Sequence, residues 1–350
     1  MAKSFLLLAL ASVVSAPWAS AYESDDFTAR ATTTGDATPS VNGFMNSALD
    51  AAIAEANGSG SPCQDPLSYA PAIPPIYEIV RQHINTNPIS AVETFVADDM
   101  NPSLRITTSL GDSIYSSGSF SNGPVLFGVG MAPSLRIGPH IIGSDKLGHF
   151  ASQGYDYFER VYAGNSVGEA LDYGMALENG LYGMATTGVR SYGDLSANEA
   201  GLRFYSELTF GSNPYITCND GRWTRARGFN ISSYVTAAWD EAVNCSEFND
   251  GLGAVVATSL AARGMTCPVD LNQCRAIALS TCSSRLVSPL CLAAAGVAPS
   301  ATLSCVERSA ALPAVPTASG GACPTPSRSG NGFMDTATSY IMELYEEYIE

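Results

Sequence analysis

Polar side chains that could carry out chemistry recur at helical spacing between Gly143 and Tyr205. The strongest candidates for a catalytic or metal-binding centre are one histidine and two acids, His149, Glu178 and Asp194. One imidazole combined with carboxylates suits a divalent metal ion, or an acid–base pair that works near neutral pH. A metal-bound or histidine-activated water could then attack an ester, a phosphoester or an amide. We therefore expect these three side chains to face one cleft.

Four further polar residues are candidates to support this centre: Asp145, Lys146, Arg190 and Asn198. Asp145 could also join the first three residues as a ligand of the metal ion. An alternative interpretation needs no chemistry, because Asp145 and Asp194 could simply cap helices. Glu178 and Asn198 would then form a buried hydrogen-bond network that fixes helix register. The chain has no nucleophile elbow, HExxH motif, P-loop or dinucleotide fingerprint that would specify a reaction.

Three helices are predicted to position these side chains, and the first two differ in character. The first begins after Ser144, and its periodicity places His149 on the polar face, one turn after Asp145. That face either meets water or lines a wet cleft. The second helix, over residues 167–184, is apolar almost all round, which favours burial. Glu178 within it must therefore be paired, hydrogen-bonded or protonated.

The third predicted helix is capped by Asp194 and turns a polar stripe inward. Asp194 and Asn198 share this stripe with Gly201 and Tyr205, flanked by apolar residues. The charged residues of the helix are predicted to point away from the core: Glu199, Arg203 and Glu207. Polar groups thus occupy positions where apolar ones would be expected, which favours a shared site.

These motifs resemble the pattern of VanZ-like proteins, which are small bacterial envelope proteins. The residues that carry the resemblance are Asp145-Lys146, His149-Phe150, Glu178, Arg190-Ser191, Asp194, Asn198 and Gly201. The fuller run from Gly143 to Phe150 is similar to secreted bacterial proteins of unknown function. The resemblance implies a helical bundle with the motif facing inward, and motivates hydrolysis of envelope lipid or wall components as a candidate function. The chain departs from the family in having Leu181 where a Gln is usual, and in lacking membrane-spanning helices.

The charge balance limits the kinds of partner. Acidic residues number 33 against 17 basic ones, and the formal net charge is -16. This balance disfavours nucleic acid and anionic membrane surfaces, and leaves an envelope component or a small molecule as partner. The only basic cluster could bind an anionic group, although pairing with local carboxylates or with Trp223 is the favoured interpretation. It consists of Arg222, Arg225 and Arg227.

The expected architecture is mainly α: a helical bundle with a small β hairpin and a disulfide-stapled helical C-terminal region. Residues 1–21 have the pattern of a secretory signal peptide, so a secreted or periplasmic location without a transmembrane anchor is predicted. The hairpin is expected from the related segments Ser103–Ile106 and Ser134–Ile137. The other parts are a flexible leader with a short helix (22–65), a VanZ-like helical core domain (66–250), a Cys-rich helical region (251–325) and a C-terminal helix (326–350).

Nine cysteines in an exported protein suggest disulfides. Cys218 with Cys245 is the most natural local pair, and Cys63 is the first candidate for a free thiol. The six cysteines from Cys267 to Cys323 leave their connectivity open. Taken together, the sequence favours an exported envelope protein with a candidate hydrolytic site that could hold a divalent metal ion. The alternative is a non-catalytic binding protein, or a structural one whose polar network only fixes helix packing.

Overall fold

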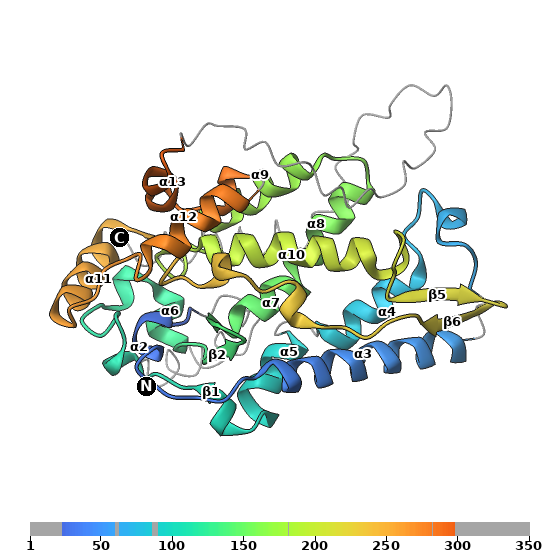
Figure 1. Cartoon of the computed structure of the whole chain (residues 1–350), viewed down its shortest axis with the longest axis horizontal. Helices are drawn as coiled ribbons and strands as arrows, with labels where there is room; N and C mark the ends of the chain where they lie inside the picture. The colour runs from blue at the N-terminus through green and yellow to red at the C-terminus, as the bar shows by residue number, and fades with distance from the viewer. Residues whose placement is uncertain (1–22, 60–62, 86–89, 181, 282, 298–350) are drawn as a thin grey trace, which may run out of the picture. The chain divides into compact units, whose positions relative to one another are not determined.

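A computed structural model describes residues 23–59, 63–85, 90–180, 182–281 and 283–297, which are mainly helical with three small antiparallel sheets (Figure 1). This confirms the predicted fold class. All described residues belong to one compact unit. Among them, no helix is both long and apolar enough to cross a membrane. The predicted signal peptide and the predicted C-terminal helix lie outside the described residues.

The helices of the described part follow one another along the chain. They are α2 (Asp26–Ala29), α3 (Thr38–Gly58), α4 (Pro75–Ile84), α5 (Ala91–Thr94), α6 (Pro124–Val129), α7 (Asp145–Ala151), α8 (Gln153–Tyr162), α9 (Val167–Glu178), α10 (Tyr192–Thr209), α11 (Asp250–Ala262), α12 (Leu271–Ser280) and α13 (Pro289–Ala295). The strands are β1 (Arg105–Ile106), β2 (Ser134–Ile137), β3 (His140–Gly143), β4 (Val189–Arg190), β5 (Ile216–Asn219), β6 (Arg222–Arg225) and β7 (Glu247–Phe248).

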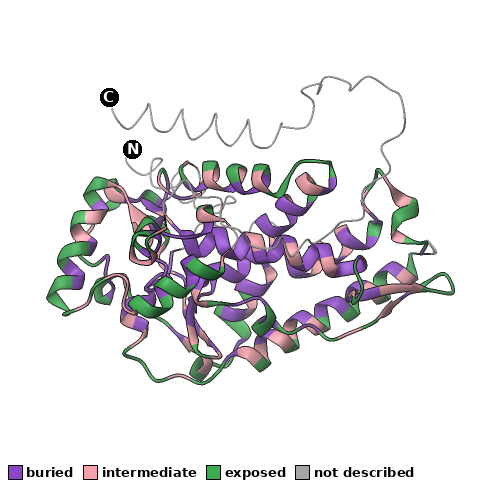
Figure 2. Ribbon diagram, turned by 45° about the horizontal axis from the view of Figure 1, so that its top comes forward, coloured by how far each residue is buried: buried purple, intermediate pink, exposed green. Residues whose placement is uncertain are grey.

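Helix α10 is the centre of the fold, and α7 and α8 pack against it (Figure 1). Figure 2 shows that buried residues dominate these three helices. Glycines allow the closest approach, because a Cβ added to Gly154 of α8 would lie 2.5 Å from the Cα of Gly201 in α10. The helix is interrupted at Ser152, between α7 and α8, and the Ser152 hydroxyl donates to the Gly148 carbonyl at 2.7 Å. The single predicted helix over this stretch is therefore two.

The predicted strands pair, and a third strand joins them. Strands β1, β2 and β3 form an antiparallel sheet in that order, with Ile106 opposite Ser134 and Ile137 opposite His140. The tight hairpin joins β2 to β3. The sequence motif at Ser103 starts in a 3-10 turn instead of a strand, because Pro102 opens that turn and the Asn101 side chain caps it.

The N-terminal segment differs most from expectation. The sequence predicts a flexible leader and a short helix over 22–65. The helix is present as α3, although it is longer than expected at 21 residues, whereas residues 23–26 of the leader are almost wholly buried. Asp25 fixes the segment, since its carboxylate accepts hydrogen bonds from the backbone N–H groups of Phe27 and Thr28. Helix α3 then packs against α4 and β6. Because these contacts are with distant segments, the sequence of the leader shows no periodic pattern that would predict them.

Helix α9 is also shorter and less buried than predicted. It ends at Glu178 instead of Met184, and turns follow through Gly180 and Gly183. Only one of its faces is buried, and Glu178 lies on that face. Part of the helix remains exposed, as at Val167.

Three disulfides staple the described residues, and two of them lie in the C-terminal helical region. Cys245 pairs with Cys267 and Cys274 pairs with Cys291, while Cys63 pairs with Cys218. The predicted Cys218–Cys245 pair and the predicted free thiol at Cys63 are therefore wrong. Proximity in sequence is a poor guide here because Cys63 follows α3, which packs along β6 beside Cys218. The remaining cysteines, Cys282, Cys305 and Cys323, lie outside the described residues.

Candidate functional site

A buried lysine, Lys146, lies at the centre of the polar cluster. The Lys146 ammonium is 2.6 Å from Asp145 Oδ2, 2.8 Å from Asp194 Oδ1 and 2.5 Å from Glu241 Oε1. Burial alone would lower the pKa of Lys146, but the surrounding carboxylates outweigh it and hold this pKa well above its usual value. The lysine is therefore charged and cancels part of the negative charge around it.

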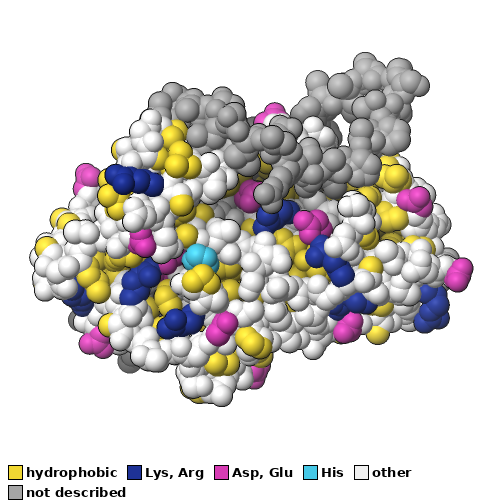
Figure 3. Space-filling view, viewed as in Figure 1, with side chains coloured by type: hydrophobic (Ala, Val, Ile, Leu, Met, Phe, Trp, Pro, Cys, Tyr) yellow, Lys and Arg dark blue, Asp and Glu magenta, His cyan; other side chains and the backbone are white. Residues whose placement is uncertain are grey.

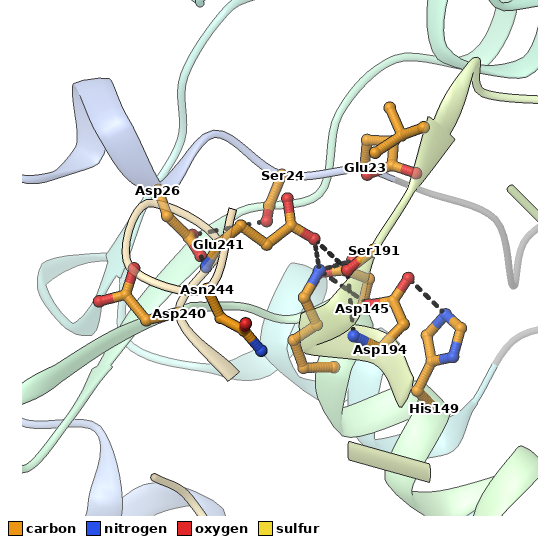
Figure 4. A network of polar contacts seen from close by, with 12 residues as sticks. Glu23, Ser24, Asp26, Asp145, His149, Ser191, Asp194, Asp240, Glu241 and Asn244 are labelled. Carbon is orange, nitrogen blue, oxygen red and sulfur yellow. Dashed lines mark hydrogen bonds and ion pairs between the residues drawn. The ribbon is translucent and has the colours of Figure 1, made fainter. Parts of the chain in front are cut away.

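His149 lies one helical turn after Asp145, as the sequence predicts, but it is buried in the core. Its Nε2 is 3.2 Å from Asp194 Oδ2 (Figure 4). On the other side of the ring, the Asn198 amide can turn so that its nitrogen donates to His149 Nδ1 at 3.1 Å. In that arrangement Nδ1 accepts, so Nε2 carries the proton and donates to Asp194. The ring is held in one tautomer between two side chains of α10.

Glu178 completes a group with His149 and Asp194. One potential ligand atom from each of the three residues lies within 4.8 Å of the others, and all three residues are buried. Glu178 Oε2 accepts a hydrogen bond from the backbone N–H of Ser191 at 3.3 Å. Burial, followed by the charge of Asp194, raises the pKa of Glu178 well above its usual range. The three candidate catalytic residues thus meet in space, and a cation between them would favour the ionised form of Glu178.

Asp194 does not cap its helix as predicted. Helix α10 begins two residues earlier, and the Ser191 hydroxyl caps it by accepting from the Asp194 N–H at 3.0 Å. The same hydroxyl donates to Glu241 Oε1 at 2.5 Å. Because Ser191 caps the helix, the Asp194 carboxylate is free to face Lys146 and His149. The expectation that the charged residues of α10 point away also holds, since Glu199, Arg203 and Glu207 are only partly buried.

A second acidic group adjoins the first and is absent from the sequence-based prediction, apart from Asp145. Glu23, Asp145 and Glu241 each place a carboxylate oxygen within 4.8 Å of the others. Thr187 donates to Glu23 Oε1 at 2.7 Å. The backbone N–H of Glu241 donates to Asp26 at 3.2 Å. Glu23 and Glu241 lie far apart in the sequence, and helical periodicity carries no signal for such contacts.

Other predicted residues lie outside this cluster. Arg190 points away, is partly exposed, and pairs with Glu247 and with the Asn179 side chain. In the basic cluster of β6 and the residues after it, Arg225 binds Asp50 at 2.8 Å and Arg227 binds Glu207 at 2.6 Å. Arg222 is exposed. Pairing with carboxylates, the favoured interpretation, is therefore what the structure shows for Arg225 and Arg227.

The cluster is closed to solvent. Lys146 and the carboxylate and imidazole residues of both groups are at most 3% exposed. A surface cleft of about 510 Å³ lies elsewhere, between the start of α4 and the end of α8, lined in part by Tyr155, Glu159 and Tyr162. On the face shown in Figure 3, acidic, basic and apolar side chains are interspersed. Ligand access to the cluster therefore requires movement of the chain, unless the ligand is bound during folding.

No protein-family model, curated protein or solved structure matches this chain.

Proposed function

We propose that this protein binds a divalent metal ion in its core through His149, Glu178 and Asp194. One observation carries the proposal: three potential ligand atoms from α7, α9 and α10 lie within 4.8 Å of one another in a buried space. Burying a carboxylate costs several kcal/mol unless a cation or a proton compensates it. Glu178 has no ammonium or guanidinium among its hydrogen-bond partners in the described part of the chain. A divalent ion would supply that compensation.

The donor set narrows the choice of metal. One imidazole with two carboxylates suits zinc, manganese or ferrous iron better than calcium or magnesium, which prefer oxygen ligands alone. Metal binding would use the other orientation of the Asn198 amide, in which His149 Nδ1 carries the proton and donates to Asn198 Oδ1 at 3.1 Å, so that the Nε2 lone pair is free to bind the metal. Asp145, the fourth predicted ligand, would help indirectly by holding the Lys146 ammonium beside Asp194.

The same donor set supports hydrolysis as the activity of an exported envelope protein. A catalytic metal site supplies three protein ligands and leaves a position open for water, which the metal then activates. The VanZ-like pattern motivates an ester or phosphoester of the envelope as substrate. The predicted signal peptide and the three disulfides support a secreted or periplasmic location. Because the ligands are buried, turnover would require an opening motion.

Metal analysis of the purified exported protein tests the proposal. We expect one zinc or manganese ion per chain in this centre, and its loss in His149→Ala and Glu178→Gln variants that keep their circular dichroism spectra. Glu93→Gln is the matched control, since Glu93 is a buried carboxylate that belongs to neither group. It should retain the ion.

The outcome also separates metal binding from a purely structural role. If His149→Ala only lowers the melting temperature, and neither it nor wild type binds metal after dialysis against zinc or manganese, the metal proposal is wrong. The polar network then serves only to fix helix packing. If metal binds but the loaded protein does not hydrolyse model esters or phosphodiesters, the protein is a non-catalytic metal binder.

A further inference from the structure

We infer that Glu23, Asp145 and Glu241 form a second cation site, which takes a hard divalent ion such as Mg²⁺, Mn²⁺ or Ca²⁺. The three carboxylates come from the N-terminal segment, the start of α7 and the loop before β7. Each places an oxygen within 4.8 Å of the other two. Figure 4 labels these three side chains, which come from separate segments of the chain. An all-oxygen donor set is the one that hard cations prefer.

Unsatisfied carboxylate oxygens are the second observation that points to a ligand. Glu23 Oε2 and Asp145 Oδ1 have no hydrogen-bond partner among the described residues, although Glu23 is 2% exposed and Asp145 is fully buried. Buried oxygens of this kind are rare, because an oxygen that leaves water without gaining a partner costs its full desolvation free energy. The opposite oxygens are already used, because Thr187 donates to Glu23 Oε1 and Lys146 donates to Asp145 Oδ2. The free oxygens are thus the ones available to an ion.

The local backbone keeps space for the Asp145 oxygen. A Cβ on Gly143 would overlap both Asp145 Oδ1 and the hydroxyl of Ser24. Residue 143 therefore carries no side chain where β3 runs into α7. Ser24 adjoins Glu23, so the N-terminal segment closes this side of the site and supplies one of its ligands.

The charge in the core favours a second ion. Five buried carboxylates form the two groups, and the Lys146 ammonium lies against three of them. A divalent ion in the first centre still leaves two negative charges uncompensated when His149 is neutral. A second divalent ion would neutralise the cluster. This charge count assumes the metal ion of the proposed function. The argument from the unpaired oxygens of Glu23 and Asp145 does not depend on that ion.

Lys146 separates the two centres. Its Nζ contacts Asp194 of the first group, and Asp145 and Glu241 of the second. It would therefore hold carboxylates of both centres in place without entering either metal coordination sphere. The first centre, with its imidazole, should prefer zinc, and the second should accept magnesium in the presence of zinc.

Native mass spectrometry with elemental analysis tests the second site on the purified exported protein. Protein loaded with Zn²⁺ and then dialysed against Mg²⁺ or Mn²⁺ should hold two ions per chain. Glu23→Gln should hold only the zinc ion, and His149→Ala only the hard ion, while Glu93→Gln should hold both. If zinc binds but no further ion does, or if Glu23→Gln keeps two ions, the second site is wrong and the first stands.

The reverse pattern would separate the two proposals. A hard ion that is lost in Glu23→Gln, without any ion that depends on His149, would support the second site and contradict the first. If Glu23→Gln does not fold, the test is made on the zinc-loaded wild-type protein alone. The measurement is then whether this protein binds one additional hard ion. Absence of that ion overturns the inference.

Discussion

Lys146 shows how far individual residues could be predicted. The sequence singles it out beside Asp145, and helical periodicity turns Asp194 and Asn198 toward the same space, where the structure places them. Periodicity works here because it relates residues within one helix. It cannot place Glu241, whose contact with Lys146 joins segments 95 residues apart. The predicted support from Arg190 fails because a surface carboxylate, Glu247, attracts it outward.

Asp156 provides a residue-scale prediction that does not involve the metal ligands. Burial, together with the charge of Glu159, raises the pKa of this carboxyl to about 6. The folded protein thus binds more protons than the unfolded chain between about pH 4 and pH 6. This contribution therefore lowers the free energy of unfolding as the pH rises through that window. Asp156→Asn should stabilise the protein at pH 7 by about 1–3 kcal/mol.

Urea denaturation of wild type and Asp156→Asn at pH 4 and pH 7 measures this effect. The two proteins should differ least at pH 4, where the aspartic acid is largely protonated when folded. A gap between them that stays constant from pH 4 to pH 7 would show that burial does not raise the pKa of Asp156.

At the scale of elements, the sequence predicts that the three central helices exist, but it predicts the contacts between them less well. Capping and periodicity give the existence of α7, α9 and α10, but not the break at Ser152 or the end of α9 at Glu178. The break coincides with a hydrogen bond from the Ser152 side chain to the backbone, and the end of α9 is followed by glycines. Serine and glycine also occur within helices, so the local sequence does not predict either feature. The close crossing of α8 and α10 depends on Gly154 and Gly201, and only the folded structure brings these glycines together.

This crossing predicts that Gly154→Ala destabilises the fold. The added methyl group would meet the Gly201 backbone, so α8 and α10 would have to separate. Overpacking of this kind costs about 1–3 kcal/mol. Gly43→Ala in α3 is the matched control, because a Cβ there meets nothing within 4 Å. It should leave stability unchanged or raise it by up to about 1 kcal/mol through helix propensity. Equal unfolding free energies for both variants would contradict the close contact.

At the scale of the whole molecule, the mainly helical fold and the stapled C-terminal region could be predicted from composition and periodicity. The connectivity of the cysteines could not, because it depends on which distant segments pack together. The same limit applies to the N-terminal segment, which was expected to be flexible and instead places Glu23 and Asp26 in the core. Long-range pairing therefore accounts for the main errors in the prediction, including the unforeseen half of the polar cluster.

The disulfides of this protein close loops of very different length. Cys63–Cys218 closes a separation of 155 residues, whereas Cys274–Cys291 closes one of 17. In the chain-entropy account, a disulfide stabilises by restricting the unfolded chain, and the effect grows with the logarithm of loop length. Replacing both cysteines by alanine should thus cost about 4–5 kcal/mol for the long loop and about 3 kcal/mol for the short one. Equilibrium urea unfolding of the two double variants, with the other bridges oxidised, gives the comparison. A larger loss from the short loop would mean that local packing around Cys274 and Cys291, both fully buried, outweighs the entropy of the unfolded chain.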